Sequence, residues 1–274
     1  AQLRPSRRGR DGAGLLVQSI LRVQTVFLLS PAFCGGRRAS ILLNPKSQAE
    51  TTRELRAGRL SLGRAFAFMS GLYFRGKLTY AQRFGEPLVI TPTRGLQHPD
   101  LKFTLALLRE FAVGDVSLDN PEYRSALERD VQALAHRIGR KANVVLLGSV
   151  ASGKYVDVLL PILGDRLRYP VSFIGRGDMS RGGLLLRSAA SGEELEYGPL
   201  TAGIRPRGPR PPKLDPLTRV AVSLVHEIDA SRAGARRGII EPALRAGTAG
   251  AKRLDAIVDI RLRPRPRVHG RPRS

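Results

Sequence analysis

Residues 143–164 read NVVLLGSVASGKYVDVLLPILG, and this stretch decides the fold class. Its first five residues, 143–147, have the apolar, β-branched character of a strand that is buried on both faces. Gly148 opens a short loop, and residues 155–164 then continue as an apolar helix that Pro161 is expected to kink or end. A buried strand followed by a loop and a helix is the repeating unit of α/β proteins.

The same alternation extends toward the N-terminus. QTVFLLSP at 24–31 and PLVITPTRGL at 87–96 each contain a short apolar strand that ends in a proline. Helical periodicity is expected in four segments: 48–58, 62–84, 101–112 and 121–139. Strands that alternate with helices through short connections imply a largely parallel sheet with helices on both faces.

The C-terminal part of the domain has a different pattern. VSFIG at 171–175, LLLRS at 184–188 and ELEYG at 194–198 are predicted to be strands, with SGEE as a hairpin turn between the last two. The predicted fold is therefore α/β, with a mainly parallel sheet and a C-terminal antiparallel strand pair.

Composition divides the chain into four parts. Residues 1–14 are predicted to be a disordered basic arm, and 15–204 a single α/β domain. Residues 205–215 have the spaced prolines and arginines of a linker. Residues 216–274 are predicted to contain one helix followed by a basic low-complexity tail.

The chain is strongly basic, with 46 Lys and Arg against 23 Asp and Glu, a formal charge of +23. This charge favours nucleic acid or a nucleotide as the partner, but a biased composition that enriches Arg, Gly, Ala and Pro together would also produce it. Cys34 is the single cysteine, which excludes an internal disulfide and favours the cytoplasm. No stretch approaches the roughly 20 apolar residues of a membrane span, and neither a metal nor a cofactor is expected.

The segment after the strand at 143–147 has the glycine and lysine spacing of a phosphate-binding P-loop. Tyr155 stands where such a loop needs a Ser or Thr to hold Mg²⁺, so the safer expectation is a simple anion site on backbone amides and Lys154. The candidate residues here are Gly148, Ser149, Ser152, Gly153, Lys154 and Tyr155.

A second candidate loop, at 175–183, is rich in glycine and carries two arginines and a carboxylate. Arginine forks suit phosphate or a base edge, whereas the alternative is a turn in which Asp178 only pairs with a neighbouring Arg. The candidate residues here are Gly175, Arg176, Gly177, Asp178, Ser180 and Arg181.

A third candidate loop, containing Thr93 and Arg94, follows the strand at 88–91. Because ligands bind at the carboxyl ends of strands in open α/β sheets, the three loops are expected to meet at one edge. Tyr73, Arg75 and Lys77 are expected to line the same site, unless they serve only helix packing and a solvated basic face.

Taken in order, these segments resemble the YaaA-like domains of unknown function, which are associated with stress response and nucleic-acid metabolism. The resemblance covers about residues 24–186. It rests on four segments: Leu72 and Tyr73 with Lys77 to Tyr80; Thr91 to Leu96 with Pro99, Asp100, Thr104 and Leu105; Val144 to Gly148 with Tyr155 and Leu159; and Gly175 to Gly183. It implies an α/β fold and a link to nucleic acid or base recognition, without defining a reaction.

The favoured hypothesis is a site at the strand ends that binds a nucleotide, or the phosphate and base of a nucleic acid. Arg94, Lys154, Arg176 and Arg181 would contact the anion. Asp178 would orient water if a glycosylase-like or base-modifying reaction occurs. The alternatives are a P-loop-like phosphotransferase and a non-enzymatic protein that binds nucleic acid through its basic tails.

Overall fold

The computed structural model describes residues 25–203, 206–212 and 214, all of which belong to one compact unit. The predicted basic arm, residues 15–24 of the predicted domain and the predicted helix and tail at 216–274 lie outside the described residues. Residues 206–212 contain neither helix nor strand.

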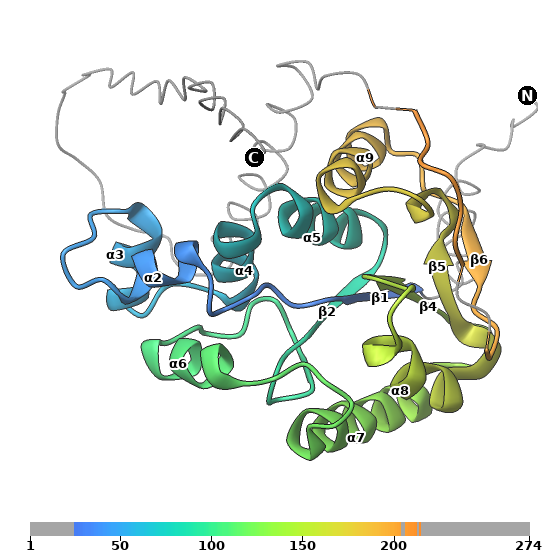
Figure 1. Cartoon of the computed structure of the whole chain (residues 1–274), viewed down its shortest axis with the longest axis horizontal. Coiled ribbons are helices and arrows are strands. Elements are labelled where there is room, and N and C mark those ends of the chain that lie inside the picture. Colours follow the sequence, from blue (N-terminus) through green and yellow to red (C-terminus); the bar gives the residue numbers. More distant parts are fainter. Residues whose placement is uncertain (1–24, 204–205, 213, 215–274) are drawn as a thin grey trace, which may run out of the picture. The chain divides into compact units, whose positions relative to one another are not determined.

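The described strands form one mixed sheet in the order β3-β2-β1-β4-β5-β6 (Figure 1). Their bounds are β1 Thr25–Leu29, β2 Glu86–Ile90, β3 Leu96–Gln97, β4 Asn143–Leu147, β5 Leu167–Pro170 and β6 Tyr197–Pro199. The four central strands, β2, β1, β4 and β5, are parallel, and the two edge strands pair antiparallel with their neighbours. The predicted fold class is confirmed.

Helices cover both faces of this sheet (Figure 1). Their bounds are α2 Arg37–Leu43, α3 Glu50–Arg56, α4 Leu62–Ser70, α5 Leu72–Phe84, α6 Leu105–Val113, α7 Pro121–Arg137, α8 Gly153–Leu163 and α9 Asp178–Ser191. Helices α4, α5 and α9 lie on one side and α7 and α8 on the other. In β1, Phe27 belongs to the first hydrophobic core and Val26 and Leu28 to the second, which explains why the strand shows no polar alternation.

The predicted helix at 62–84 is two helices that meet at Gly71. This glycine has φ 67°, in the left-handed region, where a side chain would be strained. It ends α4 and also caps the start of α5. The apolar spacing of the segment was correctly identified, but the break was not predicted.

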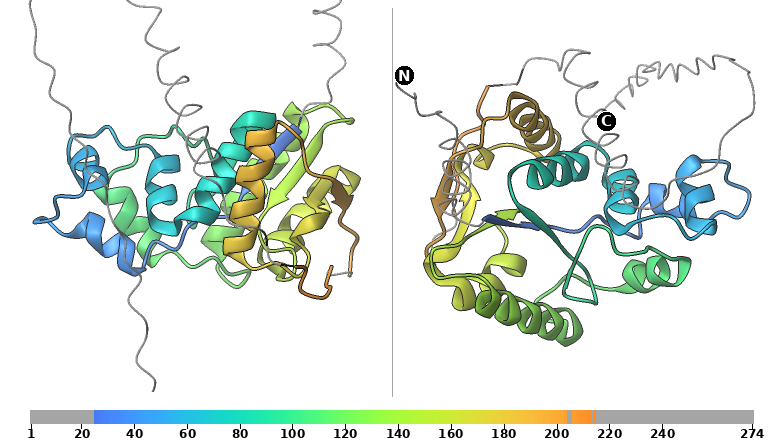
Figure 2. Two further views of the ribbon diagram at one scale, coloured as in Figure 1. Left: turned by 90° about the horizontal axis from the view of Figure 1, so that it is seen from above. Right: turned by 180° about the vertical axis from the view of Figure 1, so that it is seen from behind.

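Helices α5 and α9 lie side by side in both views of Figure 2 and pack through two glycines. A Cβ added to Gly76 would lie 2.6 Å from the carbonyl oxygen of Gly182, and a Cβ added to Gly182 would lie 2.8 Å from that of Leu72. Both positions therefore require glycine for close helix packing.

The predicted strands at 171–175 and 184–188, with their hairpin turn, are wrong. Residues Val171–Phe173 form a 3₁₀ turn, and 184–188 lie inside α9, where Leu185 and Leu186 are buried. A short apolar run cannot be assigned to strand or helix by its pattern alone. Gly182 was predicted to lie in a glycine-rich loop, but it lies in α9 and packs against α5. The antiparallel pair exists, but it joins β5 to β6.

Two helix boundaries also differ from expectation. Helix α8 begins at Gly153 and continues to Leu163, past Pro161, so the proline does not end the helix where it stands. Helix α6 begins at Leu105 rather than 101, where the Thr104 side chain accepts a hydrogen bond from the backbone amide of Leu107.

Candidate ligand site at the strand ends

The carboxyl ends of β1, β2, β4 and β5 lie at one edge of the sheet because these strands are parallel. The segments that follow them, beginning at residues 30, 91, 148 and 171, therefore start at the same edge. Three of them are the loops singled out in the sequence, although the last begins with the 3₁₀ turn and leads into α9, where a strand was expected.

A buried lysine lies behind this edge. Lys77 of α5 is only 1% exposed, and its Nζ donates hydrogen bonds to the carbonyl oxygen of Ser30 (2.6 Å) and to the Ser30 Oγ (2.9 Å). Ser30 directly follows β1, and its hydroxyl in turn donates to the carbonyl oxygen of Leu147 at the end of β4 (3.3 Å). Lys77 thus joins α5 to the ends of both central strands.

Aromatic rings surround the Lys77 ammonium. Its Nζ lies 4.5 Å from the ring centre of Tyr73 and 4.8 Å from that of Phe74, distances at which a ring face attracts a cation. Burial nevertheless lowers the pKa of Lys77 to about 7, with Asp178 acting in the opposite direction. Both protonation states of this amine are therefore accessible near neutral pH.

Two tyrosines and an ion pair complete the cluster. Burial raises the pKa of Tyr73 to about 12, an effect that Arg181 opposes. Burial also raises the pKa of Tyr155, and the charges of Tyr73 and Asp178 add to this shift. These side chains come from α5, α8 and α9, so their charges act on one another across three helices. Asp178 and Arg181 are 3.7 Å apart, which is the pairing considered as the alternative to a catalytic role.

Three buried hydroxyl groups at this edge form no hydrogen bond with any described residue: those of Tyr73, Ser152 and Ser172. Arg181 lies close enough to Tyr73 to lower its pKa through its charge and a side-chain contact, although no well-formed hydrogen bond joins the two groups. Ser152 is the residue before α8, yet its side chain does not cap the helix. We refer to Ser30, Tyr73, Lys77, Ser152, Tyr155, Asp178 and Arg181 as the strand-end cluster.

The P-loop-like segment begins in the expected place, directly after β4. Gly148 packs against Ser30, since an added Cβ would lie 3.0 Å from the Cβ of Ser30. At the other end of the segment, a Cβ on Gly153 would collide with the carboxylate of Asp157, which therefore lies beside the first turn of α8. A carboxylate beside the positive end of a helix interacts favourably with it and would compete with a phosphate. Ser149 is half-buried in the loop between them.

Lys154 and Tyr155 have separate environments. The Nζ of Lys154 lies 5.4 Å from the Tyr155 ring centre, and its backbone oxygen accepts a hydrogen bond from the Tyr123 hydroxyl. Tyr155 is 4% exposed and belongs to the core. The phenol therefore does not replace the missing Mg²⁺ ligand of a P-loop.

The arginines of the 175–183 segment are engaged with their own chain. Arg176 donates to the Ser172 carbonyl oxygen (3.0 Å) and to the Ser180 hydroxyl (3.2 Å). Arg181 donates to the carbonyl oxygen of Phe173 and lies against its ring. Both side chains therefore stabilise the turn into α9, and either would have to share its hydrogen bonds with a ligand.

The two flanking glycines of this turn have distinct positions. Gly175 has φ 71°, and the backbone of Pro209 passes so close that no Cβ would fit. Gly177 caps the start of α9 and has open space around it.

Arg94 also has a protein partner. Its guanidinium donates two hydrogen bonds to Glu110 of α6 (2.8 and 2.6 Å), and Thr93 donates to the same carboxylate (2.5 Å). Arg75 is exposed on α5, whereas Tyr73, two residues before it, is buried. The structure therefore brings Tyr73 together with the 148–155 and 175–181 segments, and directs Arg94 toward α6.

Ser30 was missed as a site residue. The signal available in the sequence was a polar residue placed directly after a buried strand, the position that was used to select the loops after the other strands. Lys77 was recognised, but its burial was not, although it follows Tyr73 and Phe74 at helical spacing on the apolar face of α5.

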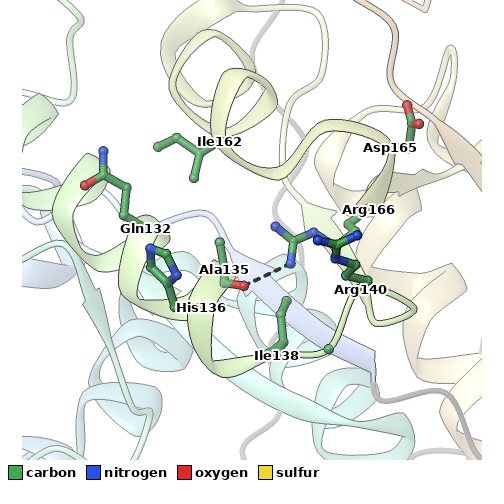
Figure 3. Close-up of a pocket in the computed structure, with 9 residues that line it drawn as sticks. Gln132, Ala135, His136, Ile138, Arg140, Ile162, Asp165 and Arg166 are labelled. Carbon is green, nitrogen blue, oxygen red and sulfur yellow. Dashed lines mark hydrogen bonds between the residues drawn. The ribbon is translucent and has the colours of Figure 1, made fainter.

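A separate pocket lies at the opposite edge of the sheet, with a volume of about 630 Å³ (Figure 3). It is formed by the C-terminal ends of α7 and α8 and by the segments leading into β4 and β5. Its lining residues are Gln132, Ala135, His136, Ile138, Gly139, Arg140, Ile162, Asp165 and Arg166. Arg166 donates to the carbonyl oxygens of Ala135 and Leu163, so its guanidinium caps the ends of two helices.

Within the described residues, no group of three or more His, Cys, Asp or Glu side chains is arranged to hold a metal ion. None of the described helices is long and apolar enough to cross a membrane.

Fold and site together define an α/β protein with a mixed sheet and a buried lysine cluster at its strand ends. Comparison with protein-family models, curated proteins and solved structures found no match.

Proposed function

We propose that this protein binds a nucleotide, or the phosphate and base of a nucleic acid, at the strand-end cluster. The resemblance to YaaA-like domains and the formal charge of +23 both favour such a partner. The position at the carboxyl ends of parallel strands is where open α/β sheets bind ligands.

The observation that carries the proposal is that two of the three buried hydroxyls without a partner among the described residues, those of Tyr73 and Ser152, lie in this cluster. Leaving a buried polar group unsatisfied costs about 1–3 kcal/mol. Such a cost is tolerated where the group serves a ligand. Here both hydroxyls belong to the strand-end cluster, which also contains Lys77, whose buried amine is a hydrogen-bond donor.

Positive charge at this edge suits an anionic ligand. Arg181 is 15% exposed and Lys154 is half-buried, so each combines a charge with partial shielding from water. Partial burial strengthens the attraction to a phosphate relative to an exposed arginine or lysine. Arg181 lies against the buried ring of Phe173, which in turn packs near that of Tyr73 (6.5 Å between ring centres), so this guanidinium is held in place by the core.

A base-modifying reaction would use Asp178. This carboxylate is 70% exposed at the first turn of α9 and lies 3.7 Å from Arg181. It would accept a proton from a water that attacks C1′ of the sugar, with cleavage of the glycosidic bond and departure of the base. The test is release of free base from oligonucleotides, which should be lost in Asp178→Asn while binding is retained.

Removal of the two hydroxyls tests the binding proposal. Tyr73→Phe and Ser152→Ala each delete one oxygen that forms no hydrogen bond with the described residues, so the free energy of unfolding should stay equal or increase. Affinity for a short single-stranded oligonucleotide should fall by about tenfold for each, since an analogous lost hydrogen bond costs on the order of 1 kcal/mol or more. Unchanged affinity in both variants would contradict the proposal.

A matched control is Tyr169→Phe, which deletes a phenol from β5 outside the cluster. Its affinity for the oligonucleotide should equal that of the unmodified chain. Equal losses in Tyr73→Phe and Tyr169→Phe would indicate a general effect on the fold rather than a contact at the site.

A further inference from the structure

Phe33 is a large apolar side chain in an unusual position. Its ring is 78% exposed, although the residues on either side of it, Ala32 and Cys34, are 4% and 2% exposed. Buried neighbours fix the course of the backbone after β1. The outward direction of Phe33 is therefore imposed by the packing of the segment and is not the result of a loosely held loop.

Two glycines lie beneath this ring. A Cβ on Gly35 would be 2.9 Å from the ring Cζ, and a Cβ on Gly36 would be 3.2 Å from the ring Cδ1. One ring face therefore rests on a backbone without side chains, and any larger residue would displace it. The arrangement holds an aromatic ring in one place while leaving most of its surface uncovered.

Two arginines follow Phe33 closely in the sequence. Arg37 and Arg38 follow the two glycines and are both exposed. Arg38 donates to the carbonyl oxygen of Phe68 (3.3 Å), which anchors its guanidinium on α4. Phe33 is three residues beyond Ser30, so its Cα lies within about 11 Å of the strand-end cluster by chain length alone.

We propose that Phe33 is a stacking platform for an unpaired base of a single-stranded nucleic acid, with Arg37 contacting the adjoining phosphate. This inference rests on the proposed function and specifies its ligand. An exposed ring beside arginines is the combination with which proteins bind single strands, because every base offers a π-face and every nucleotide a phosphate. A duplex would offer no free base face to the ring.

The chain offers a specific probe of this contact, because it contains no tryptophan. Phe33→Trp introduces a single indole at the platform, and stacking on a base should quench its fluorescence. The full chain carrying Phe33→Trp is titrated with a short single-stranded oligonucleotide, with an abasic oligonucleotide of the same length, and with the matching duplex.

Quenching by the single strand, with little change on adding the abasic strand or the duplex, is the expected result. Val113→Trp is the matched control, because Val113 is 87% exposed at the end of α6. Its indole should not respond. In parallel, Phe33→Ala should weaken binding of the single strand about tenfold, the size expected for loss of one stacked base.

The outcomes separate this inference from the proposed function. If the unmodified chain binds the oligonucleotide but Phe33→Ala binds equally well and Phe33→Trp is not quenched, the platform is wrong and the cluster remains a candidate site. If the unmodified chain does not bind, the proposed function fails first. If Phe33→Ala instead converts an oligomer to a monomer in size-exclusion chromatography, the ring is a protein contact and the stacking role is overturned.

Discussion

The Nζ of Lys77 lies 2.6 Å from the carbonyl oxygen of Ser30, a contact that joins the middle of α5 to the end of β1 across 47 residues. The amine is buried with oxygen acceptors from the backbone and a hydroxyl rather than from a carboxylate. A buried amine of this kind makes the free energy of unfolding depend on pH.

The folded-state pKa of Lys77, about 7, lies below its ordinary value of 10.5. Between these values the unfolded chain holds a proton that the folded chain has lost, so this group makes the free energy of unfolding rise with pH. The slope approaches about 1.4 kcal/mol per pH unit for a single proton. In Lys77→Met this contribution is absent, so the stability of the variant relative to the unmodified chain should decline between pH 7 and 10.

Urea unfolding at three pH values in this range measures the difference. Lys141→Met, on the exposed surface, is the control for loss of any lysine. Curves of free energy against pH that run parallel for Lys77→Met and the unmodified chain would show that Lys77 keeps its ordinary protonation in the fold.

Gly182→Ala should destabilise the protein by about 1–3 kcal/mol, because its Cβ would meet the backbone of α5 and force the helices apart. Gly139→Ala is the matched control, since nothing lies within 4 Å of the added atom. Thermal unfolding of the two variants makes the comparison. Similar melting temperatures would mean that α5 and α9 are not in close contact.

Glu110→Gln should increase affinity for a single-stranded oligonucleotide several-fold if Arg94 contacts the ligand. The substitution removes the carboxylate that holds the Arg94 guanidinium. Glu128→Gln releases Arg124 on α7 in the same way and adds the same charge. A larger gain in affinity for Glu110→Gln than for Glu128→Gln would assign Arg94 to the site. Equal gains would show that only the change in net charge raised the affinity.

We expect the purified chain to show no Mg²⁺-dependent ATP hydrolysis, and therefore no such activity for Lys154→Ala to abolish. The Asp157 carboxylate lies beside the first turn of α8, and the buried Tyr155 stands where a metal ligand is needed. Phosphate release from ATP by the purified chain provides the measurement. Turnover that requires both Mg²⁺ and Lys154 would revive the phosphotransferase alternative.

Cys34 should resist alkylation in the folded protein. Burial raises the pKa of this thiol to about 12, so the reactive thiolate is scarce at neutral pH. Because it is the only cysteine, mass spectrometry after brief treatment with iodoacetamide gives a single readout. Rapid labelling of the native chain would indicate that the segment between β1 and α2 opens, and with it the support of Phe33.

The sequence predicts the fold class because the strands at 25–29 and 143–147 are apolar on both faces, a pattern that belongs to a covered parallel sheet. It does not predict the end of the sheet, because Leu184 to Arg187 fits a strand or a helix equally well locally. The choice of helix depends on Gly182 meeting Gly76, which is a contact between segments 106 residues apart.

The site was predicted in part for a similar reason. Loops after parallel strands must share an edge, so the segments at 148–155 and 175–181 could be grouped from the order of elements. The partners of these side chains are distant in the sequence and cannot be read from local patterns. Arg94 pairs with Glu110 of α6, and Lys77 is buried against Ser30. The charge pattern marked the arginines as ligand contacts, whereas the structure shows three of them bonded to their own chain.

The central claim is that the strand ends, and not the basic termini, recognise the ligand. Amide hydrogen exchange of the full chain, measured by mass spectrometry with and without a short single-stranded oligonucleotide, tests it most directly. Protection of segments 30–36, 148–155 and 171–181 is the predicted result. Protection confined to residues 1–24 and 215–274, with these three segments unchanged, would contradict the claim and favour a protein that binds nucleic acid through its termini alone.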